Sequence, residues 1–345
     1  MTAKYICFAL SAVGIVLNAN CTSAPDLSKE LYSDNPVVAL TSYEQLVSMG
    51  PDGIEEVLES WGPDGHFGTR IIREIGPSIL DELTARLTLS ISEDDKVVTI
   101  EAIGALGPDG RGALEYLVDE LRSESQAIRV ASCEAIEAIH PDMESVGSSL
   151  YPLLEDNDIR VVSAACFTIG SLTEGANANA IQKLLGVIHA DPSGISKQAA
   201  AYALYKNGYR TDDMFELIES CALAYPSCPA YGPALYALAR IDSDASRDVM
   251  RRIVLDESKP QILAMMALTS YAKSDESARI LVDALEFEET QGSALYYLSV
   301  FGESGNAALP ELYAIRNGSS QIELFDPERN TVLLEMAILF IERES

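Results

Sequence analysis

The stretch EAIGALGPD at residues 101–109 returns as EAIEAIHPD at residues 134–142, 33 positions further along the chain. Six of the nine positions are identical. Self-similarity at such an interval is the sequence signature of a protein built from stacked structural repeats. Related segments fill the same slot further along, at 167–175, 199–207, 233–241, 266–274 and 297–305.

Aligned in this way, the segments form columns of constant side-chain size. Two columns are bulky and apolar, and they include Ile103 and Leu106 in the first segment. Small residues let neighbouring helix backbones approach, and bulky ones fill the space between repeats. The small column comprises Ala102, Ala135, Thr168, Ala200, Ala234 and Ala267.

A turn and a second amphipathic run follow each segment. Apolar residues recur at i, i+3, i+4 and i+7, as in Leu114, Leu117, Val118 and Leu121, which is helical periodicity. The tetrapeptide Gly-Pro-Asp-Gly occurs at 50–53, 62–65 and 107–110. Its first Gly suits a left-handed helix end, Pro stops the helix, and Asp suits the cap of the next one. We therefore predict an all-α fold, an α-α superhelix of stacked helix pairs.

The pattern resembles the HEAT repeat family, and more closely the short bacterial HEAT-like repeats of the phycobilisome-lyase type. An A-x-x-A-L-G helix, the Gly-Pro-Asp-Gly turn and an L-x-x-L-L second helix carry this resemblance over residues 42–345. The resemblance implies a solenoid of about seven to nine helix pairs. It also implies that second helices line the concave face and that the protein is an interaction scaffold.

The N-terminus has the features of an export signal. Residues 1–20 combine Lys4 with an uninterrupted apolar stretch, which suits a signal peptide and is too short to span a bilayer. Cys21 follows Asn-Ala-Asn, which resembles a bacterial lipobox but has Asn20 where Gly or Ala is usual. We expect either ordinary cleavage or lipidation of Cys21. Residues 21–41 would then be a flexible tether, and the protein would be exported to the periplasm or to the outer membrane or cell surface as a lipoprotein.

The charge balance limits the partners. The chain has 53 acidic and 24 basic residues, a net charge of −29. Such a chain repels phosphate backbones and anionic membrane surfaces, so we expect no nucleic-acid partner. Membrane contact would come only through a lipid on Cys21. We expect a monomer that binds a protein partner.

Motifs for chemistry are absent from the sequence. It has no nucleophile elbow, no P-loop and no dinucleotide-binding glycine motif, and none of its three histidines has a second ligand at metal spacing. We therefore expect no catalysis, no cofactor and no metal site. Residues 242–248 imitate the start of a calcium loop, but Arg247 replaces the required Gly.

Two cysteines have two open interpretations. Cys221 and Cys228 flank a short loop and would bridge in an oxidising compartment. Alternatively, Cys221 is a buried thiol in an apolar column. Cys133 and Cys166 share a column one repeat apart, and neighbouring helix axes are too far apart for an easy bridge.

Tyrosines in the C-terminal half are the candidate anchors for a partner. We expect Tyr202, Tyr205 and Tyr236 to form an exposed stripe, because Tyr202 and Tyr236 share a column with Glu137. The alternative is inter-helix packing with the hydroxyls at the surface. Arg251 and Arg252, on a second helix, would meet an acidic ligand.

These observations favour a non-catalytic, exported protein-binding scaffold. One alternative is an enzyme, or a lyase-like enzyme subunit, with a site in the concave groove. A water-accessible carboxylate pair with displaced titration in that groove would support it. A second alternative is an acidic envelope protein that binds divalent cations diffusely.

Overall fold

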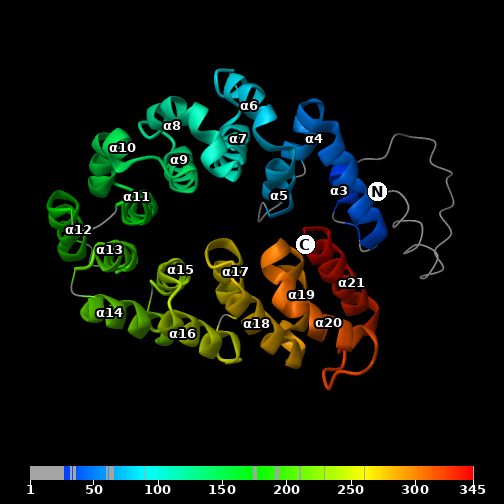
Figure 1. Ribbon diagram of the computed structural model, residues 1–345. Coiled ribbons are helices and arrows are strands. Elements are labelled where there is room, and N and C mark those ends of the chain that lie inside the picture. Colours follow the sequence, from blue (N-terminus) through cyan, green and yellow to red (C-terminus); the bar gives the residue numbers. More distant parts are fainter. Residues whose placement is uncertain are drawn as a thin grey trace.

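The computed structural model describes residues 27–31, 33, 36–59, 61, 66–89, 91–173, 177–190, 194–209, 211–228, 230–259 and 261–344. The expected signal peptide (1–20) and Cys21 lie outside these residues. Every regular element in the described part of the chain is a helix, and consecutive helices stack in order (Figure 1). The predicted all-α, HEAT-like solenoid is confirmed.

Nine helix pairs and a final helix make up the described solenoid. The first helices are α3 (Pro36–Met49), α5 (His66–Ile75), α7 (Glu93–Ala105), α9 (Gln126–Ile139), α11 (Ile159–Leu172), α13 (Ile195–Lys206), α15 (Tyr231–Ile241), α17 (Gln261–Tyr271) and α19 (Glu288–Ser299). The second helices are α4 (Ile54–Glu59), α6 (Leu80–Leu87), α8 (Leu114–Glu120), α10 (Met143–Leu150), α12 (Ala178–Ala190), α14 (Thr211–Leu223), α16 (Asp244–Val254), α18 (Asp275–Asp283) and α20 (Leu309–Arg316). The last helix is α21 (Pro327–Glu344).

Helical structure begins before residue 42. A short helix, α2 (Leu27–Glu30), precedes Leu31, whose side chain is fully buried, and α3 starts at Pro36. The expected tether over 21–41 is therefore too long, because its apolar residues Leu31 and Ala39 are part of the core.

The first helices, and not the second ones, line the inside of the curve (Figure 1). The expectation of a concave face made by second helices is therefore wrong. The small column explains the arrangement, because all six of its members lie on first helices and are buried. Helices with small contact residues approach more closely, so the first helices take the shorter, inner path.

The solenoid curves until its two ends meet. Helix α21 packs on α3, so the last element covers the first one (Figure 1). Arg70 of α5 is buried and donates hydrogen bonds to the backbone oxygens of Ser299 (2.9 Å) and Phe340 (2.7 Å). Arg343 of α21 forms ion pairs with Glu44 (2.7 Å) and Glu74 (3.0 Å). The described chain is thus a closed ring of helix pairs.

The Gly-Pro-Asp-Gly turns differ from expectation in one respect. Gly50 and Gly107 adopt the left-handed conformation, with φ of 60° and 58°, as predicted. Each then leads directly into a 3-10 helix, Gly50–Gly53 or Gly107–Ala113, with Pro at its start and no side-chain cap. The Asp residues therefore do not cap the second helices, and the third copy, at 62–65, lies outside the described residues.

Within the described residues, no helix has both the length and the apolar character required to cross a bilayer.

Candidate functional site

An ion pair joins two inner helices that are not neighbours along the ring. Arg240 of α15 donates from Nε to Glu137 Oε1 (2.9 Å) and from a terminal nitrogen to Glu137 Oε2 (3.1 Å). Glu137 lies on α9, so the contact passes over α11 and α13. Ser171 donates to the same carboxylate (2.7 Å), and its hydroxyl also contacts the Tyr202 hydroxyl (2.9 Å).

Aromatic rings enclose the guanidinium of this pair. The Arg240 carbon Cζ lies 3.5 Å from the centroid of the Tyr271 ring and 4.2 Å from that of Phe167. The Arg240 side chain is only 6% exposed and that of Glu137 is 15% exposed. Aromatic faces attract a desolvated cation, so carboxylate and rings together hold this arginine in place.

The pKa values of the two carboxylates of α9 are shifted in opposite directions. Burial opposes ionisation of Glu137, but the Arg240 charge and the hydrogen bonds from Arg240 and Ser171 outweigh it and lower the pKa. Crowding by protein on the inner face raises the pKa of Glu134 to about 7, and the Arg240 charge offsets only part of this. The Glu134 side chain itself is exposed to solvent.

These groups line a cavity of about 460 Å³ on the inner face of the ring, called here the central cavity. Its size is typical of a pocket for a small ligand. It offers carboxylate, guanidinium, ammonium and hydroxyl groups beside an aromatic wall. The lining residues are Arg73, Gly107, Glu134, Glu137, Ala138, His140, Ser171, Tyr202, Lys206, Arg240, Ser270 and Tyr271.

Tyr202 is not an exposed anchor, and its predicted exposure is wrong. Its side chain is 2% exposed, and burial raises the pKa of its hydroxyl to about 12. The ring occupies space that Gly170 leaves on the neighbouring helix, since a Cβ at Gly170 would lie 2.9 Å from the Tyr202 ring. The column is polar at Glu137 because that position faces Arg240.

Tyr205 and Tyr236 are half-buried and do not form a stripe with Tyr202. Tyr205 packs against Phe215 of α14, with ring centroids 6.2 Å apart. Tyr236 meets Tyr271 edge to face at 5.6 Å. The structure therefore places these tyrosines in packing roles between helices, which was the alternative interpretation.

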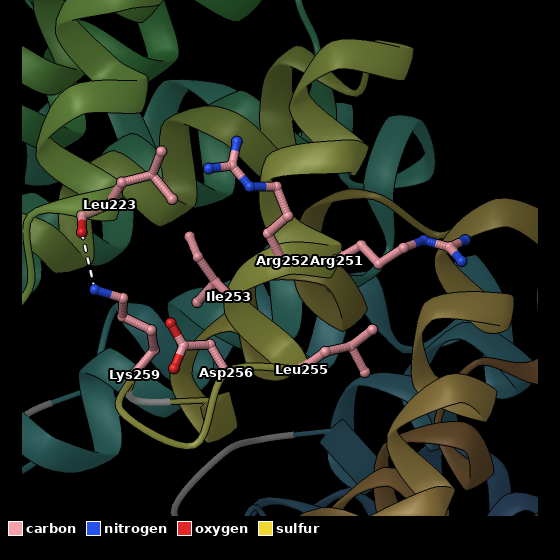
Figure 2. A pocket seen from close by; sticks show the side chains of 7 residues that line it. All are labelled: Leu223, Arg251, Arg252, Ile253, Leu255, Asp256 and Lys259. Carbon is pink, nitrogen blue, oxygen red and sulfur yellow. Dashed lines mark hydrogen bonds between the residues drawn. The ribbon is translucent and has the colours of Figure 1, made fainter.

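Arg251 and Arg252 lie on an outer helix of the ring, whereas Tyr202 and Tyr236 belong to inner helices (Figure 1). Both belong to α16 and line an outer groove of about 500 Å³, formed by Leu223, Arg251, Arg252, Ile253, Leu255, Asp256 and Lys259 (Figure 2). Their side chains diverge: that of Arg252 extends on the side of Leu223, and that of Arg251 extends away from it (Figure 2). Arg251 pairs with Asp283 (2.5 Å), and Arg252 lies 3.6 Å from Glu219.

A disulfide holds one wall of the outer groove. Cys221 and Cys228 are bridged, with α-carbons 5.4 Å apart. The bridge spans the end of α14 and the following turn, where the backbone oxygens of Leu223 and Tyr225 accept hydrogen bonds from Lys259 Nζ at 2.9 and 3.5 Å. Cys133 and Cys166 are free and buried.

Sequence reasoning missed the Glu137–Arg240 pair. Glu137 stands in a column that holds Gly104 and Gly170, and a charge among glycines was the available signal. Nothing in the sequence indicated its partner, because Arg240 lies three repeats away. Among the described residues, no group of three His, Cys, Asp or Glu side chains is arranged to hold a metal ion.

Comparison with known proteins gives one family match, over part of the chain. The family model of HEAT repeats matches residues 114–205, which run from α8 into α13, so this part of the chain is similar to HEAT repeats. No curated protein matches the chain. Among solved structures, an engineered protein from the Northeast Structural Genomics Consortium is similar over 93% of this chain and 100% of its own, with 17% identity and a TM-score of 0.35.

Proposed function

We propose that this protein is a non-catalytic, exported scaffold, monomeric by itself, that binds a protein partner through its outer surface. The HEAT repeats support this proposal, because such repeats generally mediate contacts between proteins. Export to the periplasm or cell surface rests on the apolar leader and on Cys21. We also propose that its repeats are of the short bacterial phycobilisome-lyase type, but not that the protein has lyase activity.

The closed ring directs a protein partner to the outside. The first helices face inward, and the last helix covers the first, so the inner face has no open end along the solenoid. A folded domain does not fit into a cavity of about 460 Å³. The outer helices remain accessible around the ring.

The outer groove is the best candidate for the contact. Arg252 and Lys259 stand on its two sides, and the partly exposed Leu223 provides apolar surface beside them (Figure 2). The Arg252 side chain is 55% exposed. In a chain with net charge −29, two cations beside apolar surface complement an acidic segment that also carries apolar side chains.

Charge reversal tests this site directly. A displayed library of acidic and apolar peptides would be selected on the full chain, and the affinity of the selected peptide measured for Arg252→Glu and Lys259→Glu. We expect each variant to weaken binding at least tenfold, because an attractive pair becomes repulsive. Arg122→Glu is the matched control, since Arg122 is also exposed and lies outside the groove. Equal binding by all four proteins would refute the groove.

Mass spectrometry of the mature N-terminus tests export. Cleavage before Cys21 with added acyl mass would establish a lipoprotein, and cleavage without it would establish ordinary secretion. A protein that still begins at Met1 after expression in a bacterial host with a cell envelope would contradict export.

One observation favours the enzyme alternative. Glu134 and Glu137 form a carboxylate pair on the central cavity, with pKa values displaced in opposite directions. Acid and base pairs in active sites often show this behaviour. However, Arg240 and Ser171 already donate hydrogen bonds to the Glu137 carboxylate. If the chain turns over a substrate and the Glu134→Gln variant does not, that result would support the enzyme over the scaffold.

A further inference from the structure

Two opposite charges in the central cavity have no partner among the described residues. Glu134, on α9, and Lys206, at the end of α13, both line the cavity. Neither makes a hydrogen bond or an ion pair within the described part of the chain, and they do not pair with each other. Both side chains are exposed to solvent, so a ligand in the cavity can reach both of them.

The other charged groups of the cavity are already engaged. Glu137 and Arg240 neutralise each other. Arg73, from α5, donates its Nε hydrogen to the backbone oxygen of Ala105 (3.1 Å). The His140 ring contacts the backbone oxygen of Ser171 (3.2 Å). Glu134 and Lys206 are therefore the anion and the cation that remain available to a ligand.

Neutral groups between these charges complete the wall. The Ser171 and Tyr202 hydroxyls contact each other on α11 and α13, and Ser270 and the Tyr271 ring line the cavity from α17. Tyr271 is 37% exposed, so part of its ring is available for contact. Since helices on several sides of the closed ring hold these groups, the cavity is formed before a ligand arrives.

We propose that the central cavity binds a small ligand that carries both an ammonium and a carboxylate group, such as a free amino acid or a dipeptide. Glu134 receives the ammonium group, and Lys206 receives the carboxylate. The hydroxyls and the Tyr271 ring contact the body of the ligand. This site is independent of the outer groove and does not depend on the scaffold proposal.

The protonation of Glu134 is consistent with this assignment. Its pKa is raised to about 7 mainly because protein surrounds it, with further contributions from Glu137 and Glu101 and an opposing one from Arg240. An ammonium group beside the carboxylate favours its ionised form. Binding near neutral pH therefore releases a proton from Glu134, and calorimetry in buffers of different ionisation enthalpy detects that release.

Blocked dipeptides provide the test. Binding to the full chain would be measured by saturation-transfer NMR and calorimetry for L-alanyl-L-alanine, for its N-acetyl form without the ammonium, and for its amide without the carboxylate. A pool of the free amino acids would be measured in parallel. We expect each blocked form to bind about tenfold more weakly than the parent dipeptide, because one charge-assisted contact is lost.

Variants assign each contact. Glu134→Gln should weaken binding of the parent dipeptide, so that it binds no more tightly than the N-acetyl form. The parent dipeptide should still bind more tightly than its amide. Lys206→Met should do the reverse. Glu115→Gln, on the exposed face of α8, and Lys197→Met, on the same helix as Lys206, should leave both preferences unchanged.

Three outcomes would overturn the proposal. The first is no binding of the dipeptide or of any amino acid in the pool to the wild-type chain. The second is equal binding of parent and blocked dipeptides. The third is binding that both cavity variants leave unchanged. Peptide binding at the outer groove is measured separately, so a failure here is distinguishable from a failure of the scaffold proposal.

Discussion

Glu137 and Arg240 stand 103 positions apart in the chain, and their side chains meet in a two-contact ion pair on the inner face of the ring. The pair ties α9 to α15 across the two inner helices between them. A solenoid in which each repeat touches only its neighbours has no such contact. Together with the contacts that α19 and α21 make with the first repeats, the pair distinguishes this ring from an open superhelix.

Breaking the ion pair should be costly when only one partner is removed. Glu137→Gln leaves the buried Arg240 charge without its counter-ion, and we expect a loss of about 3–5 kcal/mol in the free energy of unfolding. Arg240→Met should cost a similar amount. The double variant should lose clearly less than the sum of the two, because no isolated charge remains. Urea denaturation measures all four proteins, and strictly additive losses would show that the two residues do not interact.

Stability should depend on pH through Glu134. Its pKa is about 7 in the folded chain and 4.5 as an ordinary carboxyl, so the folded chain binds more protons between these values. The free energy of unfolding should therefore fall as pH rises from about 4.5 to 7 through this group. Glu134→Gln should remove this fall when unfolding is measured from pH 4 to 8. Glu144→Gln, on the exposed side of α10, is the control and should keep the wild-type profile.

Glu137 should have the opposite effect at lower pH. Its pKa lies below the ordinary value, so its contribution to stability is present above pH 4.5 and is lost as pH falls through the folded-state pKa. In the Glu137→Gln variant, the free energy of unfolding should therefore depend less on pH below pH 4.5. A variant that changed the limb above pH 4.5 instead would contradict the assignment of the two carboxylates.

Ring closure should depend on Arg70. Its guanidinium satisfies two backbone oxygens, those of Ser299 and Phe340, and lies 4.6 Å from the centroid of the Phe340 ring. Arg70→Met leaves both oxygens without this donor, at a cost of about 1–3 kcal/mol each. Hydrogen exchange in α21 should accelerate, and small-angle scattering should report a larger radius of gyration.

Arg343→Met is the matched control for Arg70. Arg343 also bridges α21 to the first repeats, but its ion pairs with Glu44 and Glu74 are partly exposed. Such pairs contribute about 0–1 kcal/mol. An Arg343 variant that opens the ring more than the Arg70 variant would reverse the proposed order of importance.

Substitution of two helical glycines by alanine should change the free energy of unfolding in opposite directions. A Cβ at Gly170 would lie 2.7 Å from the Ala203 α-carbon, so Gly170→Ala should force α11 and α13 apart and cost about 1–3 kcal/mol. A Cβ at Gly186 of α12 meets nothing within 4 Å. Gly186→Ala should raise the free energy of unfolding by about 0.5–1 kcal/mol, because alanine favours helix. Thermal melts of both variants decide this, and destabilisation by Gly186→Ala would contradict it.

The helix pairs were predictable because their signal is local. Residues such as Leu114 and Leu117 recur at helical spacing within one segment, and the repeat brings the same pattern back at a nearly constant interval. Cys221 and Cys228 could also be suggested as a pair, because only a short turn separates them. Each of these features depends on residues close together in the chain.

Tyr202 shows where this local reasoning failed. Its column also contains glycine and glutamate, which suggested a polar position, yet its side chain is 2% exposed. The missing information was the neighbour across the helix interface, since Gly170 leaves the space that the ring fills. Arg251 and Arg252 lie on the outer helix α16, whereas Tyr202 and Tyr236 lie on inner helices (Figure 1), a difference that residue spacing alone did not reveal.

Short-range patterns in the chain are enough to establish that it forms amphipathic helices in pairs, that the pairs repeat, and that small residues mark one helix of each pair. The inward orientation of the first helices, the closure of the curve and the contact of Arg240 with Glu137 arise from packing over the whole molecule. The physical reason is that each interface adds a small rotation, and a few degrees per repeat separate an open superhelix from a closed ring. Local periodicity specifies that an interface forms, whereas its angle depends on how all the side chains pack together.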